Sequence, residues 1–322
     1  MSTPSPPSLW QRFLSYSSPN LDVPLPASAI DRFLFGVAQP ILALRLLLSE
    51  QGFLIDALKP ALLLAGFCAL AALLHLEIGG TESVQHLGFL RRFYATFAVL
   101  APLPSIVLST HYARLAAKAY RRFQFGDCAH LRSSLWQAAI HALKQALVIA
   151  IAVAPLLGLV KHVPWLGTGL AAMVGALWAL HWVVVEAFDS ARVAPVSVEA
   201  NPPSDNRFEN VEGRNPQAAT APEPPEVWFV RPMFRLADRL PIGKRMVRWF
   251  ASFCRYLSRP WQEEIALTEA HPVLVFGFAL TTAALLATPV LNLLFRPIIV
   301  TAAVALLGQL ARSRAPADAA QR

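Results

Sequence analysis

Long runs of residues without a charged side chain constrain the fold of this 322-residue chain more than any other feature. A helix needs about 20 apolar residues to cross the roughly 30 Å hydrocarbon core of a bilayer. Inside that core, backbone N–H and C=O groups must pair within the protein, so only helices and closed barrels cross it. The alternation that a barrel strand needs over about ten residues is not sustained anywhere in the sequence. We therefore predict an all-α, polytopic membrane protein from the uncharged runs at residues 60–76, 93–108, 146–160, 163–185, 272–295 and 297–310.

The composition agrees with a membrane protein and gives no sign of catalysis. Hydrophobic residues make up 55% of the chain and charged residues 15%, whereas a soluble domain carries about 25% charged residues. The sequence signatures of serine hydrolases, P-loop proteins, zinc proteases and dinucleotide-binding proteins are absent. Cys68, Cys128 and Cys254 lie too far apart to form a metal or redox motif. We expect neither an enzyme nor a bound cofactor or metal ion.

Two proline-bracketed turns interrupt the apolar runs at similar places. The first runs from Pro155 to Pro164 and the second from Pro289 to Pro297. Proline removes a backbone donor and disfavours helix at the preceding residue, so each pair of prolines predicts a break between two helices. Two such breaks at corresponding places are typical of an internal repeat built around a translocation site. Two unrelated helical hairpins would give the same pattern, and both interpretations stay open.

The order of apolar and polar segments divides the chain into six regions. A helix over residues 31–48 contains Pro40 and two arginines, which favours a position at the membrane interface. Two spanning helices are predicted to begin near residues 55 and 91. The regions are a polar tail (1–30), the first membrane part with the first hairpin (31–196), a disordered cytoplasmic insertion (197–226), a basic aromatic interfacial segment (227–262), the second membrane hairpin (263–311) and a second polar tail (312–322).

The distribution of Lys and Arg sets the predicted orientation. The segment between the two spans, residues 77–92, is balanced in charge, whereas the polar segments after the second span and around the second hairpin are rich in basic residues. We therefore expect both termini and the insertion in the cytoplasm. A bacterial inner membrane is the expected location. The apolar arms 146–160 and 297–310 are shorter than a full span, so we expect the hairpins to be partly re-entrant.

The segment before the second hairpin combines basic and aromatic side chains. Residues 227–261 contain eight basic and eight aromatic residues against a single acid, Asp238. Basic heads beside an aromatic face suit an anionic membrane surface, where each basic residue contributes about 1 kcal/mol. We expect this segment to contact anionic lipids rather than nucleic acid, through Arg231, Arg235, Arg239, Arg245 and Arg248.

Three stretches of the chain look like parts of one known family. The first is Phe35-Gly36 with Leu46-Leu47-Leu48, Gly52-Phe53-Leu54 and Pro60, followed by a span. The second is Phe188-Asp189-Ser190-Ala191-Arg192-Val193, and the third is Phe276-Gly277-Phe278 through Pro289-Val290-Leu291-Asn292-Leu293 and Pro297. These stretches resemble the CysZ sulfate permease family, whose superfamily includes the eukaryotic etoposide-induced membrane proteins. The resemblance implies two spanning helices, partly penetrating hairpins, and homo-oligomers with a sulfate pathway.

The chain departs from this family where an anion would bind. The transporters carry Gly-Leu-Arg after the first helix, whereas this chain reads Gly52-Phe53-Leu54 and lacks the arginine. Basic residues at the hairpin tips are candidates to replace it, because a charge deep in a bilayer costs about 2.5–3.5 kcal/mol and is usually functional. Tips at the interface, with side chains that reach water, are the alternative. The anion-pathway candidates are Arg296, Asn292, Lys161, His162 and Gly52, and Asp189 with Arg192 forms a hairpin-end motif.

Two functional hypotheses follow from these residues and the resemblance. The first is a CysZ-like permease for sulfate or another small anion. The second is a non-transporting membrane scaffold of the same superfamily that binds lipids or partner proteins. In both cases we expect the lipid bilayer, with anionic lipids, and further copies of the chain as partners, and no nucleic acid.

Overall fold

The computed structural model describes residues 7–18, 24–78, 108–125, 128–129, 135–163, 166–192, 194–195, 227–241, 243–287 and 292–319. Helices make up nearly all of these residues. A two-residue antiparallel ladder joins β1 (Cys128–Ala129) to β2 (Ala194–Pro195). The predicted all-α class is confirmed. The insertion 197–226, and residues 91–107 of the predicted second span, lie outside the described residues.

Three of the described helices contain a segment long and apolar enough to cross a membrane. They are α2 (Ala29–Ser49), α8 (Gly167–Ser190) and, through its segment Phe295–Ser313, α13 (Asn292–Ala319). A bent pair, Lys244–Ala270 followed by Pro272–Ala287, passes the same test together. The protein is therefore a helical membrane protein, and the first predicted span lies within the 28-residue α3 (Gln51–Ile78).

The helix α2 is longer and more apolar than an interfacial helix requires. It passes through Pro40 without ending, and half of its most apolar window is buried inside the molecule. Ser28 caps its first turn by accepting a hydrogen bond from the Asp31 amide. The position of residues 31–48 at the interface thus stays a prediction, and α2 also meets the length of a span.

Each predicted bracket contains a break between two helices, but two of its prolines do not end a helix. Pro155 lies inside α7 (Leu135–Lys161), and Pro297 lies inside α13. The first turn therefore falls between Lys161 and Gly167, after the proline rather than at it. A helix tolerates an internal proline in a membrane protein when neighbouring groups satisfy the freed backbone. The apolar part of α7, Ala139–Pro155, remains short of a span, whereas the predicted short arm 297–310 belongs to the longer apolar segment of α13.

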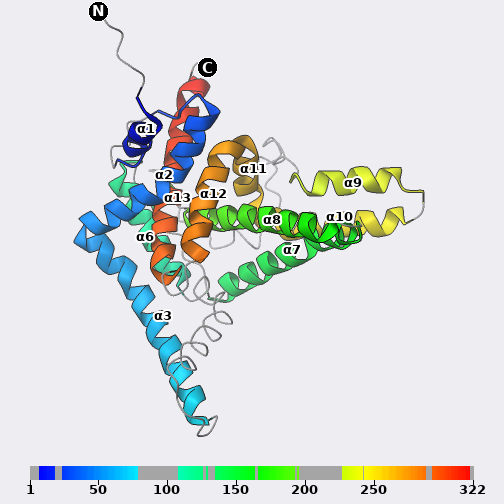
Figure 1. Cartoon of the computed structure of the whole chain (residues 1–322), viewed down its shortest axis with the longest axis horizontal. Helices are drawn as coiled ribbons and strands as arrows, with labels where there is room; N and C mark the ends of the chain where they lie inside the picture. Colours follow the sequence, from blue (N-terminus) through cyan, green and yellow to red (C-terminus); the bar gives the residue numbers. More distant parts are fainter. Residues whose placement is uncertain are drawn as a thin grey trace, which may run out of the picture.

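The helix α13 lies at the centre of the larger bundle. It packs against α2, α3, α8, α6 (Ser109–Arg122) and α12 (Pro272–Ala287). Each residue from Pro297 to Leu306 is buried. Figure 1 shows α13 upright among these helices, with α3 extending away below them. The core around it is apolar and includes Phe35, Leu42, Phe188, Phe278 and Leu306.

Two glycines bring the backbones of α2 and α12 into direct contact. A Cβ at Gly36 would lie 2.1 Å from the carbonyl oxygen of Leu274, and a Cβ at Gly277 would lie 2.3 Å from that of Phe33. The hydroxyl of Thr281 donates to the Gly277 carbonyl at 3.2 Å. Small residues at such crossings let membrane helices approach closely, where packing drives their association. Two of the family-like stretches therefore meet at one helix crossing.

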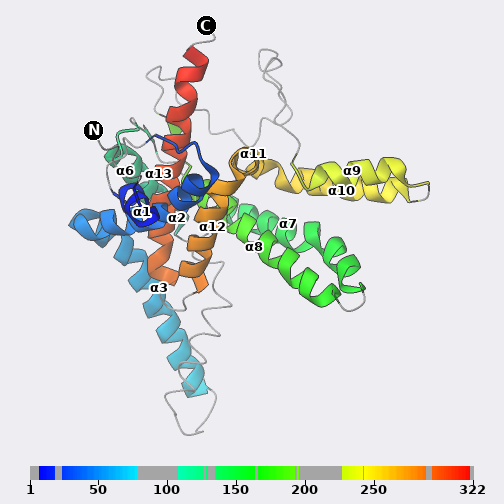
Figure 2. The ribbon, with the colours of Figure 1, turned by 45° about the horizontal axis from the view of Figure 1, so that its top comes forward.

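A second cluster of helices extends to one side of the bundle. It contains α7, α8, α9 (Val230–Arg239) and α10 (Lys244–Ser258), and Figure 2 shows these helices reaching away from α13. Tryptophans hold the cluster: the Trp178 indole donates to the Ile149 carbonyl at 2.9 Å, and the rings of Trp182 and Trp261 are 5.7 Å apart. A short 3-10 helix (Arg259–Trp261) and α11 (Gln262–Ala270) lead back to α12.

The predicted polar tail 1–30 contains a helix, α1 (Leu9–Tyr16). Ser8 and Gln11 form a capping box at its start, which satisfies two backbone donors. Tyr16 packs edge-on against Phe35, and Arg12 pairs with Asp31 at 3.2 Å, so α1 is fastened to α2. Burial, together with the charge of Asp31, raises the pKa of Tyr16. The serine- and proline-rich composition of this region hid that helix.

Candidate functional site

The most distinctive site in the bundle is a partly buried ion pair between α13 and α8. Arg296 pairs with Glu186, and their side chains are 18% and 35% exposed. The Arg296 guanidinium lies 5.6 Å from the centre of the Tyr112 ring, so α6 supplies a third wall. Arg296 was a sequence candidate, whereas Glu186 and Tyr112 were missed. The available signal was Glu186 itself, an acid at the end of the uncharged run 163–185.

This arrangement gives Arg296 a defined electrostatic environment. A guanidinium carries five N–H donors in a rigid fork, which match the oxygens of a carboxylate or another oxyanion. Here the Glu186 carboxylate occupies part of that fork, and the face of Tyr112 offers the negative side of its quadrupole to the cation. The site can therefore hold one oxyanion group against Arg296.

The other hairpin-tip candidates do not gather around Arg296. Lys161 ends α7 and His162 follows it, and both are exposed. The His162 ring lies 2.6 Å from the Gly158 carbonyl oxygen through Nδ1. From Glu186 to the start of α8 at Gly167 is about 28 Å along the helix, at about 1.5 Å per residue. Asn292 begins α13 one turn before Arg296, and its side chain lies outside the described part of the structure.

Gly52 receives a cation from another helix. The Lys118 ammonium of α6 donates to the Gly52 carbonyl oxygen at 2.7 Å and to Asp56 at 2.6 Å. It also lies 4.7 Å from the centre of the Phe53 ring. A positive charge thus lies beside the first turn of α3, paired with the carboxylate of Asp56. Local sequence could not reveal this contact, because 66 residues separate its partners.

The hairpin-end motif joins three helices through polar contacts. His141 of α7 lies 2.9 Å from the Asp189 carboxylate, and its ring centre is 4.4 Å from that of Trp261. Arg192, just beyond α8, pairs with Glu263 and, at 3.4 Å, with Glu264 of α11. These contacts connect the base of the first hairpin to the segment before α12. The geometry gives Asp189 and Arg192 a structural role.

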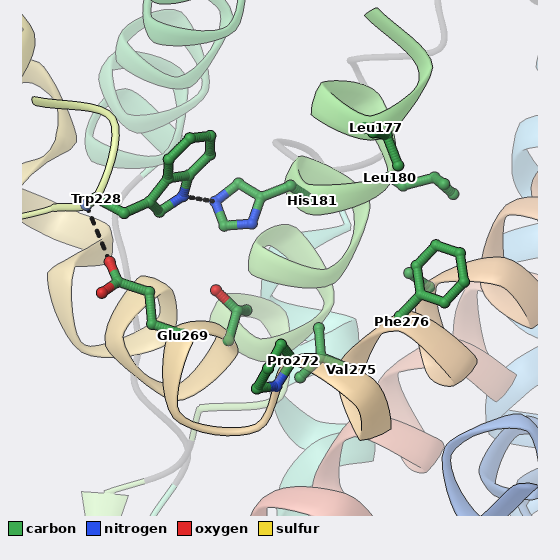
Figure 3. Close-up of a pocket in the computed structure, with 10 residues that line it drawn as sticks. Leu177, Leu180, His181, Trp228, Glu269, Pro272, Val275 and Phe276 are labelled. Carbon is green, nitrogen blue, oxygen red and sulfur yellow. Dashed lines mark hydrogen bonds between the residues drawn. The ribbon is translucent and has the colours of Figure 1, made fainter. Parts of the chain in front are cut away.

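A pocket of about 280 Å³ lies between α8 and the junction of α11 with α12 (Figure 3). Its lining is mostly apolar, with His181, Thr268 and Glu269 as polar exceptions. The Trp228 indole donates to His181 at 3.5 Å, and Glu269 accepts from the Trp228 amide at 2.9 Å and from Arg231 at 2.7 Å. The Glu269 carboxylate is thus engaged within the protein, and the rest of the lining is mostly apolar. The apolar lining includes Leu177, Leu180, Pro272, Val275 and Phe276.

The predicted membrane-surface arginines lie on two separate helices. Arg231, Arg235 and Arg239 belong to α9, and Arg245 and Arg248 belong to α10. Gly243, whose φ of +82° suits glycine, separates the two helices. Arg231 pairs with Glu269 and Arg248 pairs with Asp238, at 2.7 and 2.6 Å. Arg235, Arg239 and Arg245 are exposed.

Comparisons of the chain with protein-family models, with curated proteins and with solved structures found no match. Within the described residues, no group of three or more His, Cys, Asp or Glu side chains could hold a metal ion.

Proposed function

We propose that this protein passes a small oxyanion of the sulfate class across a membrane. The observation that carries the proposal is the half-buried Arg296, enclosed by α6, α8 and α13. An ionisable side chain among apolar membrane helices is costly, and such residues usually mark an ion or substrate pathway. The chain resembles the sulfate permeases but lacks the arginine of their Gly-Leu-Arg motif. Arg296 is the candidate to replace that arginine.

The counter-ion of Arg296 supports this function. Glu186 presents a carboxylate to the guanidinium, which is the kind of group that a bound oxyanion would replace. An anion that enters must therefore displace Glu186 from Arg296 and take over its hydrogen bonds. Such competition keeps binding weak enough for release, which conduction requires.

We propose that the protein lies in a bacterial inner membrane with both termini in the cytoplasm. The excess of Lys and Arg in the polar segments around the second hairpin supports this orientation. We propose further that copies of the chain associate, as in the family that the sequence resembles.

Uptake of radiolabelled sulfate by proteoliposomes tests the proposal. We expect uptake by the wild-type chain and at least a tenfold loss for Arg296→Gln. Glu186→Gln should bind sulfate more tightly, because the neutral amide competes less well for the guanidinium. Arg312→Gln is the matched control: Arg312 is also on α13 and lies 4.6 Å from the Phe125 ring centre, but it is exposed.

Two results would contradict the proposal. One is wild-type uptake no faster than that of empty liposomes, for sulfate and for other small oxyanions. The other is uptake by folded Arg296→Gln equal to that by Arg312→Gln. Elution as one homogeneous species in size-exclusion chromatography establishes that each variant is folded.

The second candidate function is a membrane scaffold that does not transport. The pairing of Arg296 with Glu186 favours it, because this pair also works as a clamp between α13 and α8. In that case Arg296→Gln and Glu186→Gln would both lower thermal stability, and neither variant nor the wild type would carry sulfate.

A further inference from the structure

The helix α10 has three distinct faces along its length. Its buried face consists of Ala251, Cys254, Leu257 and Ser258 and faces the rest of the side cluster. At about 100° per residue these four positions span about 120° of the helix surface. An amphipathic helix of a soluble protein would carry only polar residues on the remaining surface. Here the remaining surface divides into an aromatic arc and a basic arc.

The aromatic arc consists of Met246, Trp249, Phe253 and Tyr256. Their spacing of three, four and three residues places them within about 80° of one another. Met246 is 71% exposed, Trp249 66% and Tyr256 60%, so large apolar side chains cover an outer face of the protein. The rings of Trp249 and Phe253 stack at 5.6 Å with an interplanar angle of 4°. Lys144 of α7 lies 5.2 Å from the Tyr256 ring centre, beside the arc.

The basic arc consists of Lys244, Arg245, Arg248 and Arg255. These positions fall within about 100° of one another, between the buried face and the aromatic arc. All four side chains are exposed. Contacts with α9 orient two of them: Arg248 donates to Asp238 at 2.6 Å, and the Arg255 guanidinium lies 4.9 Å from the Phe234 ring centre. The helix α10 contains no acidic residue.

The direction of α10 relative to α12 indicates what covers the two outer arcs. The helical rod from Lys244 to Ala270 meets α12 at a bend of 109°. The helix α12 is apolar throughout and packs against α2 and α13, two helices with span-length apolar segments. If α2, α12 and α13 cross the bilayer, the segment from Lys244 to Ala270, which makes an angle close to a right angle with α12, lies along the bilayer surface. Figure 2 shows α9 and α10 extending sideways from the upright α12 and α13.

We propose that α10 docks on an anionic phospholipid surface, with its aromatic arc inserted at the boundary between headgroups and acyl chains. Tryptophan and tyrosine prefer that boundary, and an interfacial helix buries its apolar face there while its bases contact lipid phosphates. The charge of the basic arc selects anionic lipid over zwitterionic lipid. Each basic residue shifts the docking equilibrium by about fivefold. This inference does not depend on the passage of an anion.

Spin labels on the full-length chain test this docking. The labels replace Met246 in the aromatic arc and Ser252, an exposed residue within the basic side of the same helix, in a variant without the native cysteines. The chain is reconstituted in vesicles of phosphatidylcholine with phosphatidylglycerol. We expect oxygen to relax the label at 246 several-fold more than a water-soluble nickel chelate does, and the reverse at 252.

Charge variants test the choice of lipid. Lys244→Gln with Arg245→Gln should weaken docking by about 25-fold and make the label at 246 accessible to the nickel chelate. Removal of two exposed bases on α6, Arg114→Gln with Arg121→Gln, is the matched control and should leave the label protected.

Three results would overturn the proposal. The first is equal access of the nickel chelate to labels at 246 and 252 in anionic vesicles. The second is equal protection of the label at 246 in purely zwitterionic and anionic vesicles at physiological salt. The third is dipolar broadening between labels at 246, which would show that a second copy of the chain covers the arc instead of lipid.

Discussion

Replacement of either glycine at the crossing of α2 and α12 should destabilise the protein. In Gly277→Ala the new Cβ would lie 2.3 Å from the Phe33 carbonyl oxygen, about 1.1 Å closer than ordinary contact at 3.4 Å. That oxygen belongs to the backbone of a helix, so no side-chain rotation relieves the clash and the two helices must separate. Overpacking of this kind costs about 1–3 kcal/mol, and we expect the upper end. Alanine recovers about 1 kcal/mol of helix propensity, so the net loss is about 2 kcal/mol.

The assay is the apparent melting temperature in one detergent at one heating rate. For a chain of 322 residues, about 2 kcal/mol corresponds to a decrease of roughly 3 °C. Gly36→Ala should cost at least as much, because its Cβ would approach the Leu274 oxygen to 2.1 Å. Gly175→Ala is the matched control: it lies within α8 with nothing within 4 Å of its Cβ, and should leave the temperature unchanged or raise it. Equal melting temperatures for Gly277→Ala and Gly175→Ala would refute the reasoning.

Three further changes should have measurable effects. Phe188→Ala removes a buried ring whose centre lies 5.9 Å from that of Phe278, and it should lower the free energy of unfolding by about 3–5 kcal/mol. The measurement is the melting temperature, and the control Phe188→Leu should change it only mildly. Lys118→Met removes the contacts with Gly52 and Asp56 and should speed amide hydrogen exchange in the first turns of α3, with little change in α8. Gly243→Ala forces a Cβ into the left-handed region at a cost of about 1–2 kcal/mol and should speed proteolysis between α9 and α10; unchanged cleavage would contradict this.

The class of fold could be predicted because membrane insertion leaves a one-dimensional signal. The uncharged run 163–185 corresponds to α8, which has the apolar length that the bilayer requires whatever the tertiary packing. Local rules failed at Pro155 and Pro297, which both lie within helices. Ending a helix frees several backbone groups that water would have to satisfy, whereas a helix that continues through a proline leaves a single carbonyl for neighbouring groups of the protein to satisfy.

The candidate site was predictable only in part, because its contacts join distant segments. Arg296 stood out as a lone cation at a hairpin, but its partner Glu186 is 110 residues away and on another helix. The same holds for Lys118, which no local motif connects to Gly52. The glycines of the family-like stretches were visible as motifs, whereas their mutual backbone contact required the crossing of α2 and α12. Residue type can be read from one sequence, and the choice of partner cannot.

The central position of α13 has a consequence for how the protein is made. In chain order α13 follows every helix that surrounds it, including α2, α3 and α6. At about 5–20 residues per second, synthesis from the end of α2 to the start of α13 takes roughly 10–50 s. During that time the helices around α13 lack the helix against which they pack. A nascent chain in this state can accept the α13 of a neighbouring copy, so exchange of this helix between chains is the assembly error to which this architecture is most exposed.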